Sequence, residues 1–195
     1  VDMLDDLPAG CLLVLDEAYV ECAPDGTAIS IDVNDPRVIR MRTFSKVYGM
    51  AGLRVGYAMG TAELIAAFNK VRNHFGVSRI AQAAALAALE DGTWLDQVKT
   101  DITQARDRIS GIARDNGLMP LPSATNFVTI DCGSDGNFAK AVLDGLIARG
   151  IFVRMPFAAP QNRCIRVSCG RPQDLDGFAS ALPGALADAR AGTDG

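Results

Sequence analysis

The chain has 195 residues, of which 49% are hydrophobic and 22% charged, and its formal net charge is −4 at pH 7. This composition predicts a soluble protein with a real core, and the negative charge argues against a general nucleic-acid partner. The five cysteines form no C-x-x-C pair and only one histidine is present, so we expect free thiols in a reducing cytoplasm and no metal site. Every stretch of membrane-spanning length carries charges, and no signal pattern opens the chain, so we expect no membrane span or secretion signal.

Residues 1–7 are predicted to be the end of a helix that leads into a central strand. Five consecutive apolar residues follow at 11–15, a pattern typical of a parallel strand buried on both faces. Asp16 comes next and would be desolvated there, so it could stay ionised only beside a cation. Plainer interpretations are that Asp16 caps a turn or helix and that Tyr19 fills the core with its hydroxyl satisfied.

A second strand is predicted over 38–44, and it runs into the segment T-F-S-K-V-Y-G-M-A-G-L-R-V-G-Y at 43–57. The glycines of this segment allow a turn that approaches a ligand closely. Lys46 therefore lies at the end of a strand, which is where α/β sheets bind ligands. An amine removed from water tends to lose its proton and becomes a nucleophile that can form a Schiff base.

Ser45 and Arg54 suit a phosphate, because a hydroxyl donates one hydrogen bond and a guanidinium can donate two in parallel. A Schiff-base lysine between phosphate ligands indicates pyridoxal phosphate. Asp16 would then keep the pyridine nitrogen protonated, so that the ring draws electrons from the substrate. Tyr19 would donate its hydroxyl to the ring oxygen beside the imine. In the plainer alternative, Lys46 is a solvated lysine before a glycine-rich turn.

The rest of the first half contains a predicted strand at 57–60 and a helix at 61–73 that Thr61 caps. A polar loop around His74 precedes an alanine-rich helix that Ser78 opens and that ends near residue 90. His74 is the only histidine and is tempting as an acid or base. Lys46 already fills that role, so we interpret His74 as a polar loop residue.

A long amphipathic helix is predicted over 93–116 as the bridge to a second domain. A final helix is predicted over 173–189. The Pro183-Gly184 pair is expected to divide it into two shorter helices, because an interior proline costs about 3 kcal/mol. The smaller domain between them has predicted strands at 126–130, 151–154 and 164–168 and a helix at 137–149.

Two arginines lie in the predicted strands of this smaller domain. Arg166 stands between Ile165 and Val167, and Arg154 ends the neighbouring strand. An arginine within an apolar strand is costly unless it has an anionic partner. That partner is either a carboxylate of the chain or a bound anion. Asn126 is expected near the site, without an assigned role.

The pattern D-E-A-Y at 16–19, with T-F-S-K-x-Y-G-x-A-G-L-R-x-G-Y at 43–57, resembles the cofactor site of fold-type I pyridoxal phosphate-dependent aminotransferases. It is most similar to the histidinol-phosphate aminotransferase group. The likeness covers about 13–182. It implies an α/β fold, the C-terminal part of a fold-type I transferase, with a partial, mostly parallel sheet and a small α+β C-terminal domain. The implied divisions are a large-domain part at 1–92, a connecting helix at 93–116, the small domain at 117–190 and a tail at 191–195.

The resemblance also implies roles for individual residues. Lys46 would carry the cofactor and then shuttle the proton of the reaction. The other cofactor ligands would be Asp16 for the pyridine nitrogen, Tyr19 for the ring oxygen, and Thr43, Ser45 and Arg54 for the phosphate. Arg166 would bind the acidic group of the substrate, and Arg154 would assist when that group is a phosphate.

Proteins of this family carry a long further segment before this point, with a phosphate loop, a ring-stacking aromatic and an asparagine. We therefore expect this chain to be the C-terminal part of an enzyme, either truncated or a partial gene product. The family forms homodimers with shared active sites. The implied reaction is transamination from an amino donor to a keto acid or a phosphorylated ketone, with ping-pong kinetics.

Three alternatives stay open. A decarboxylase of a phosphorylated amino acid shares these motifs. A chain that lacks the first part of the enzyme can be a non-catalytic fragment. A nucleotide-binding module is the most remote alternative, because Gly49, Gly52 and Gly56 do not have the G-x-G-x-x-G spacing.

Overall fold

A computed structural model describes residues 2–193. The chain divides into two compact units, residues 1–99 and 100–195, and this division falls inside the long helix α3 (Gly92–Asp115). The domain limits expected after residues 92, 116 and 190 stay predictions. Residue 1 of the expected first helix and residues 194–195 of the expected tail lie outside the described residues.

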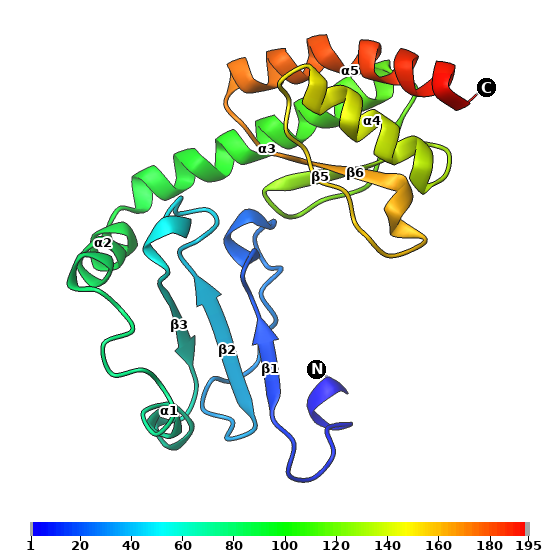
Figure 1. The fold of residues 1–195 in the computed structure, drawn as a ribbon. Coiled ribbons are helices and arrows are strands. Elements are labelled where there is room, and N and C mark those ends of the chain that lie inside the picture. The colour runs from blue at the N-terminus through cyan, green and yellow to red at the C-terminus, as the bar shows by residue number, and fades with distance from the viewer. Residues whose placement is uncertain (1, 194–195) are drawn as a thin grey trace. The chain divides into compact units, whose positions relative to one another are not determined.

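The first unit is built on a three-stranded mixed sheet (Figure 1). Its strands are β1 (Leu13–Asp16), β2 (Val38–Thr43) and β3 (Gly56–Met59), in the order β1-β2-β3. β1 and β2 run parallel, whereas β2 and β3 run antiparallel. All three lie within two residues of their predicted positions. Short 3-10 helices lie at Asp2–Leu4, Val20–Cys22 and Ala51–Leu53.

β1 is less buried than its apolar sequence predicts. Leu13 and Leu15 are half-buried, but Val14 is 52% exposed. Successive strand residues point to opposite faces, so one face of β1 is left open by the described residues. The expectation of a strand buried on both faces is therefore wrong for this chain.

Helices α1 (Ala62–Phe68) and α2 (Arg79–Glu90) begin at their predicted caps. Ser78 Oγ accepts a hydrogen bond from Ala81 N at 3.1 Å, and Thr61 caps α1 in the same way. α1 ends before its predicted end at residue 73. The reason is that Val71 is 83% exposed, and a helical turn without tertiary burial is marginal.

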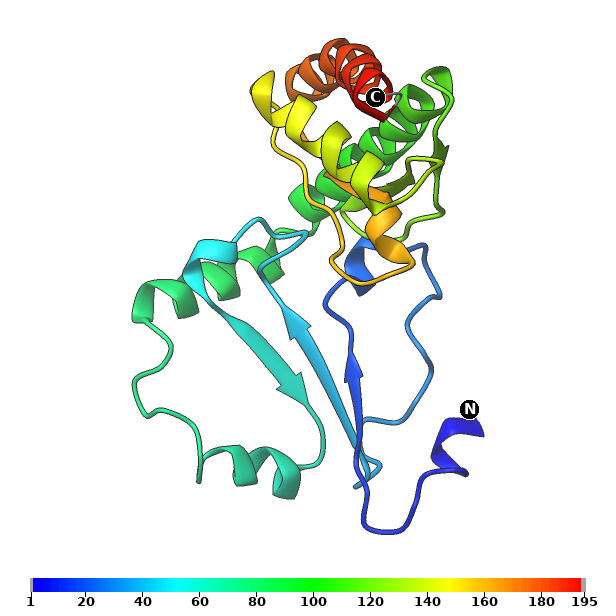
Figure 2. The same ribbon diagram turned by 45° about the vertical axis from the view of Figure 1, so that its right-hand side comes forward.

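The second unit contains a three-stranded antiparallel sheet, and helices α4 and α5 lie side by side on one face of it (Figures 1 and 2). The short strand β4 was not predicted from the sequence, because two residues give no periodicity. The elements are β4 (Met119–Pro120), β5 (Phe127–Asp131), α4 (Gly136–Ala148), a 3-10 helix (Gln161–Arg163), β6 (Cys164–Ser168) and α5 (Pro172–Thr193).

A single apolar core fills this unit between the sheet and its helices. α3 contributes Ile109, β5 contributes Ile130 and β6 contributes Ile165, all with no exposed surface. α4 and α5 add Leu146 and Leu182, which are equally buried. These buried residues lie on the helices and strands of this unit that were predicted from the sequence.

Residues 151–154 do not form the predicted strand. They make one isolated bridge to β6, between Arg154 and Arg166. Arg154 N donates to Arg166 O at 3.1 Å, and Arg166 N donates to Arg154 O at 2.6 Å. Pro156, at the next pairing position toward the C-terminus, has no N–H to donate, so the ladder does not continue past Arg154 in that direction.

α5 continues through Pro183, so the expectation of two shorter helices is wrong. Pro183 is exposed, and its ring faces solvent. Phe178, Leu182 and Leu186 on the opposite side are each at most 2% exposed. Their burial offsets the loss of one helical hydrogen bond, since packing of an apolar face supplies most helix stability in proteins.

None of the helices within residues 2–193 is long and apolar enough to cross a membrane. The same residues hold no group of three or more His, Cys, Asp or Glu side chains arranged to bind a metal ion.

Replacing Pro183 by alanine is expected to stabilise the protein. The substitution restores the N–H that can bond to the carbonyl of Ala179, and the free energy of unfolding should rise by about 1–3 kcal/mol. Urea denaturation measures the change. Pro172→Ala at the start of α5 is the matched control and should be nearly neutral, because the first helical N–H has no intrahelical partner. A Pro183→Ala protein that is less stable than the wild type would contradict this account.

Candidate active site

The ends of β1 and β2 bring the D-E-A-Y segment and the lysine segment to one edge of the sheet. The two strands are parallel, with Asp16 opposite Met41 in the ladder. One residue further on, Glu17 N donates to Met41 O at 2.9 Å. The segments that begin at Asp16 and Thr43 therefore leave the sheet at the same edge, where ligands bind in α/β folds.

Two buried neighbours hold the turn that carries Lys46. Phe44 is 2% exposed and Val47 is 3% exposed, so the backbone on both sides of Lys46 is anchored. Gly49 N donates to Lys46 O at 2.9 Å, and Met50 N donates to Phe44 O at 2.9 Å. Gly49 has φ +69°, a left-handed conformation that favours glycine.

The amine of Lys46 lies over the ring of Tyr19, with Nζ 4.8 Å from the ring centroid. Both residues are half-buried. The face of an aromatic ring attracts an ammonium group at this distance. Two of the residues singled out in the sequence are thus brought together from different segments.

Asp16 is exposed, so the expected desolvation of its carboxylate is wrong for this structure. It shares the open face of β1 with Val14. Its Oδ1 accepts a hydrogen bond from Ala18 N at 3.0 Å, which is the turn cap of the plainer interpretation. Asp16 and Tyr19 both line a hollow of about 230 Å³ beside Thr27.

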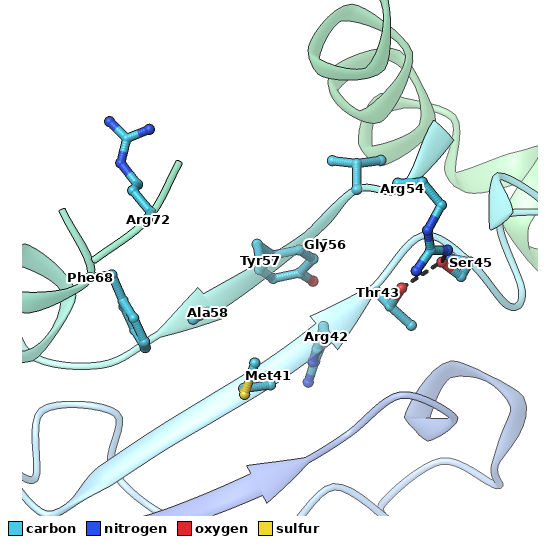
Figure 3. Close-up of a pocket in the computed structure, with 11 residues that line it drawn as sticks. Met41, Arg42, Thr43, Ser45, Arg54, Gly56, Tyr57, Ala58, Phe68 and Arg72 are labelled. Atoms are coloured by element: carbon cyan, nitrogen blue, oxygen red, sulfur yellow. Dashed lines mark hydrogen bonds between the residues drawn. The ribbon is translucent and has the colours of Figure 1, made fainter. Parts of the chain in front are cut away.

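Thr43, Ser45 and Arg54 lie at one end of a second hollow, of about 430 Å³ (Figure 3). Arg54 Nη1 donates to Ser45 Oγ at 3.3 Å and to Ala51 O at 2.8 Å. Thr43 Oγ1 accepts from Ser45 N at 3.1 Å. Two hydroxyls and a guanidinium therefore converge, and these are the donors that suit a phosphate. Lys46 is not among the residues that line either hollow.

Arg54 has a left-handed backbone, with φ +53° and ψ +49°. It directly follows the 3-10 helix Ala51–Leu53. This conformation costs a residue with a Cβ roughly 1–2 kcal/mol. Strain of this kind persists where the surrounding structure imposes it, and it gathers at functional sites. This conformation was not predicted from the sequence, because arginine is an unusual residue in it.

The far end of the second hollow is lined by residues that the sequence analysis did not select. Phe68 at the end of α1 and Arg72 just after it lie away from Arg54 (Figure 3). Arg72 Nε donates to Asn69 Oδ1 at 2.6 Å. No sequence motif predicts these positions. Phe68 and Arg72 reach the hollow because of the way the chain turns at the end of α1, which is not visible in the sequence.

Glu17 joins the ends of β1 and β2 through two arginines. Its Oε1 accepts hydrogen bonds from Arg40 Nε at 3.1 Å and from Arg40 Nη2, and its Oε2 accepts one from Arg42 Nε at 3.0 Å. Burial raises the pKa of Glu17, but the hydrogen bonds and charges of Arg40 and Arg42 outweigh burial and lower this pKa below its ordinary value. This triad was not predicted from the sequence. The pair of arginines two positions apart in the apolar strand β2 could have indicated it, because buried arginines require an anionic partner.

Glu21 is a second carboxylate beside Arg42. Its Oε1 lies 3.9 Å from Arg42 Nη1, and neither carboxylate oxygen has a hydrogen-bond partner among residues 2–193. Burial raises the pKa of Glu21. Burial, followed by the nearby Glu21 charge, also raises the pKa of Tyr48. Glu17 is therefore the carboxylate that chiefly balances Arg42.

Arg154 and Arg166, the two arginines selected from the sequence, are joined by the backbone bridge described above. The guanidinium of Arg166 lies over the Phe127 ring, 4.7 Å from its centroid. Its Nε is buried and has no hydrogen-bond partner among the described residues. Arg154 is exposed. Neither arginine forms an ion pair within residues 100–193.

His74 fits its plainer interpretation as a polar loop residue, and the expected position of Asn126 near the site stays a prediction. His74 is an exposed residue of the loop between α1 and α2. The backbone carbonyl of Asn126 accepts a hydrogen bond from Cys169 N at 2.9 Å, so Asn126 helps to hold the end of β6. These contacts assign no chemistry to either side chain.

The sheet edge, the lysine turn and the pattern of residues place the chain in a known class of protein. Residues 1–182 match the family model of the aminotransferases of class I and II, and the chain belongs to this family. It is similar to "Histidinol-phosphate aminotransferase 2" of Pseudomonas fluorescens (strain Pf0-1), with 37% identity over 191 residues, 95% of this chain and 50% of the relative.

Two other proteins are also similar to this chain, a further relative in sequence and a solved structure. The chain is 41% identical over 180 residues to "Aromatic amino acid aminotransferase" of Mycobacterium avium (strain 104), covering 90% of this chain and 48% of the relative. A solved histidinol-phosphate aminotransferase from Sinorhizobium meliloti, in complex with pyridoxal-5'-phosphate, matches with a TM-score of 0.90 and 51% identity over 94% of this chain and 51% of that one.

These matches confirm the predicted fold class, an α/β fold of the fold-type I transferases. The chain spans about half the length of the curated relatives it matches.

The strain at Arg54 predicts that two substitutions differ in stability but not in phosphate binding. Arg54→Gly should be more stable than Arg54→Ala by about 1 kcal/mol, because glycine adopts the left-handed conformation without a Cβ clash. Both variants remove the guanidinium, so both should bind inorganic phosphate equally poorly. Thermal unfolding and phosphate titration measure the two effects. Equal stability of the two variants would show that the backbone of Arg54 is not strained.

Proposed function

We propose that this protein takes part in pyridoxal phosphate-dependent transamination, as its relatives' names suggest. The observation that carries the proposal is the position of Lys46. Its Nζ lies over Tyr19 at the shared edge of two parallel strands, so a lysine amine meets the segment that carries Asp16. Pyridoxal phosphate would supply a ring that withdraws electrons and makes the Cα–H bond of a bound amino acid acidic.

The residues on the sheet edge fit the phosphate of this cofactor. Ser45 and Thr43 provide hydroxyls, and Arg54 already donates to Ser45 Oγ. Arg54 is exposed, so the other N–H groups of its fork can face a ligand. An arginine held in a strained conformation beside two hydroxyls is the arrangement expected for an anion site.

The other residues would divide the chemistry among them. Lys46 Nζ would bind the cofactor covalently and then carry the proton removed from the substrate Cα. Asp16 would hold a proton on the pyridine nitrogen, and Tyr19 would donate its hydroxyl to the neighbouring ring oxygen. Asp16 is exposed here, and a ring bound over the open face of β1 would exclude water from its carboxylate and strengthen its attraction to the ring nitrogen.

Arg166 would bind the acidic group of the substrate. Its buried Nε without a partner supports this role, because buried polar groups are normally hydrogen-bonded. Arg154 would assist when the acidic group is a phosphate, as in a histidinol phosphate-like substrate. The amino acceptor would be a keto acid.

We further propose a homodimer in the cytoplasm for the complete enzyme. The cysteine pattern favours a reducing compartment, and the family resemblance favours a dimer with shared active sites.

The first test is covalent labelling of the lysine. The chain is mixed with pyridoxal phosphate and reduced with borohydride, and mass spectrometry locates the modified residue. We expect the label on Lys46 and its loss in Lys46→Ala, because Nζ is the proposed nucleophile. Lys70→Ala, which removes an exposed lysine, is the matched control and should keep the label. A label spread evenly over surface lysines would contradict the proposal.

The second test addresses Asp16. Asp16→Asn should slow the reaction with an amino donor by about three orders of magnitude, or roughly 4 kcal/mol, because an amide cannot hold the proton on the ring nitrogen. The rate is followed by the visible absorbance of the bound cofactor. Asp25→Asn, in an exposed loop, is the control. A loss below about tenfold, or roughly 1.4 kcal/mol, would show that Asp16 is not the partner of the ring.

The reaction products distinguish transamination from the decarboxylase alternative. Transfer of the amino group that depends on a keto acid supports transamination. Release of carbon dioxide from a phosphorylated amino acid would instead support a decarboxylase.

A further inference from the structure

Glu17 belongs to none of the roles assigned above, yet it is among the most constrained side chains of the first unit. It is 9% exposed, and its partner Arg40 is 8% exposed. Arg40 also donates from Nη1 to Ile31 O at 3.2 Å. The carboxylate is therefore held by two guanidinium groups, one of which is itself fixed to the loop before β2.

We propose that Glu17 is a positioning residue for the lysine site, an inference that rests on the proposed function. It sets the spacing between the segment of Asp16 and Tyr19 and the segment of Thr43 and Lys46. It acts through the two segments that it joins, by way of its contacts with Arg40 and Arg42.

The main chain of Glu17 supports this role on the β1 side. Glu17 lies between Asp16 and Tyr19 in sequence, so a shift of Glu17 moves both. Its N donates to Met41 O at 2.9 Å, and its O accepts from Val20 N at 3.1 Å. With its side chain also bound, the residue is fixed at every polar group, and the turn that carries Tyr19 is fixed with it.

Arg42 supports the same role on the β2 side. It directly precedes Thr43, and its Nε donates to Glu17 Oε2 at 3.0 Å. The contact therefore fixes the end of β2, where the turn of Lys46 begins. A catalytic group misplaced by about 1 Å can lose on the order of a hundredfold in rate, so this spacing matters for the chemistry.

Glu17 also restrains the guanidinium group of Arg42. Arg42 lines the same hollow as Ser45 and Arg54. Glu17 binds its Nε and balances its charge, whereas Glu21 lies 3.9 Å from Nη1. Without Glu17, the guanidinium of Arg42 is released to compete for an anion in the hollow. Loss of Glu17 thus disturbs both the lysine turn and the phosphate end.

The experiment compares Glu17→Gln with a matched carboxylate in the other unit. Asp131 has the same exposure as Glu17, 9%, and its Oδ1 accepts from Arg163 Nε at 2.9 Å. Glu17→Gln leaves two arginines, Arg40 and Arg42, without their shared carboxylate, and Asp131→Asn leaves Arg163 without its carboxylate. Thermal unfolding, the affinity for pyridoxal phosphate and the visible spectrum of the bound cofactor are measured for each variant.

We expect Glu17→Gln to weaken pyridoxal phosphate binding by about tenfold or more and to shift the visible spectrum. Asp131→Asn should lose stability but keep the affinity within about twofold, because its pair with Arg163 belongs to the second unit and does not hold the ends of β1 and β2. Glu17→Asp keeps the charge and should recover part of the affinity. If Glu17→Gln does not fold, Glu17→Asp decides the question by a loss of roughly threefold or more.

Three results would overturn the positioning role. The first is wild-type affinity and spectrum in Glu17→Gln or, if that variant does not fold, in Glu17→Asp. The second is an equal loss of affinity in Asp131→Asn, which would show a general effect of stability. The third is tighter binding in Glu17→Gln, which would show that Glu17 only restrains Arg42. A wild-type chain that does not bind pyridoxal phosphate at Lys46 would instead overturn the proposed function, and the positioning role with it.

Discussion

The contact of Glu17 with Arg40 and Arg42 is the interaction on which the geometry of the candidate site depends. A buried ion pair is often no more stabilising than apolar residues of the same size, but removing one partner costs about 3–5 kcal/mol. Such a contact is thus a poor way to gain stability and an effective way to fix a geometry. The first unit has a small core around Phe44 and Val55, so the sheet edge relies on this polar contact more than a well-packed sheet would.

The two units differ in how they hold their shape. The second unit has one continuous apolar core that joins its sheet to its helices. Its Arg166 is supported by the Phe127 ring and by backbone bonds to Arg154. The first unit instead leaves Val14 and Met41 exposed on one face of its sheet. Lys46 and Asp16, for which cofactor chemistry is proposed, thus belong to the less packed unit, whereas Arg166, proposed to bind the substrate, belongs to the more packed one.

The sequence predicted local features well and long-range contacts poorly. Thr61 and Ser78 were found as caps because a cap is a property of neighbouring residues. The break expected at Pro183 was wrong because burial of the opposite helix face outweighs one lost hydrogen bond. Asp16 was expected to be buried because its strand is apolar, but burial depends on what covers the strand. Glu17 was missed because its partners Arg40 and Arg42 lie in another strand. Their spacing indicates that they need an anion, but it does not show which segment supplies one.

Arg42 and Arg54 show why residue type alone does not assign a role. Both line the same hollow, and both are cations that suit a phosphate. Arg42 lies on a regular strand, its Nε is bound to Glu17 and its Nη1 lies 3.9 Å from Glu21, so carboxylates already partner its charge. Arg54 is exposed and has a left-handed conformation, and its hydrogen-bond partners within residues 2–193 are a hydroxyl and a carbonyl. Because neither of these partners is negative, the charge of Arg54 is the one left to meet an anion. The division of roles between two identical side chains is therefore made by Glu17.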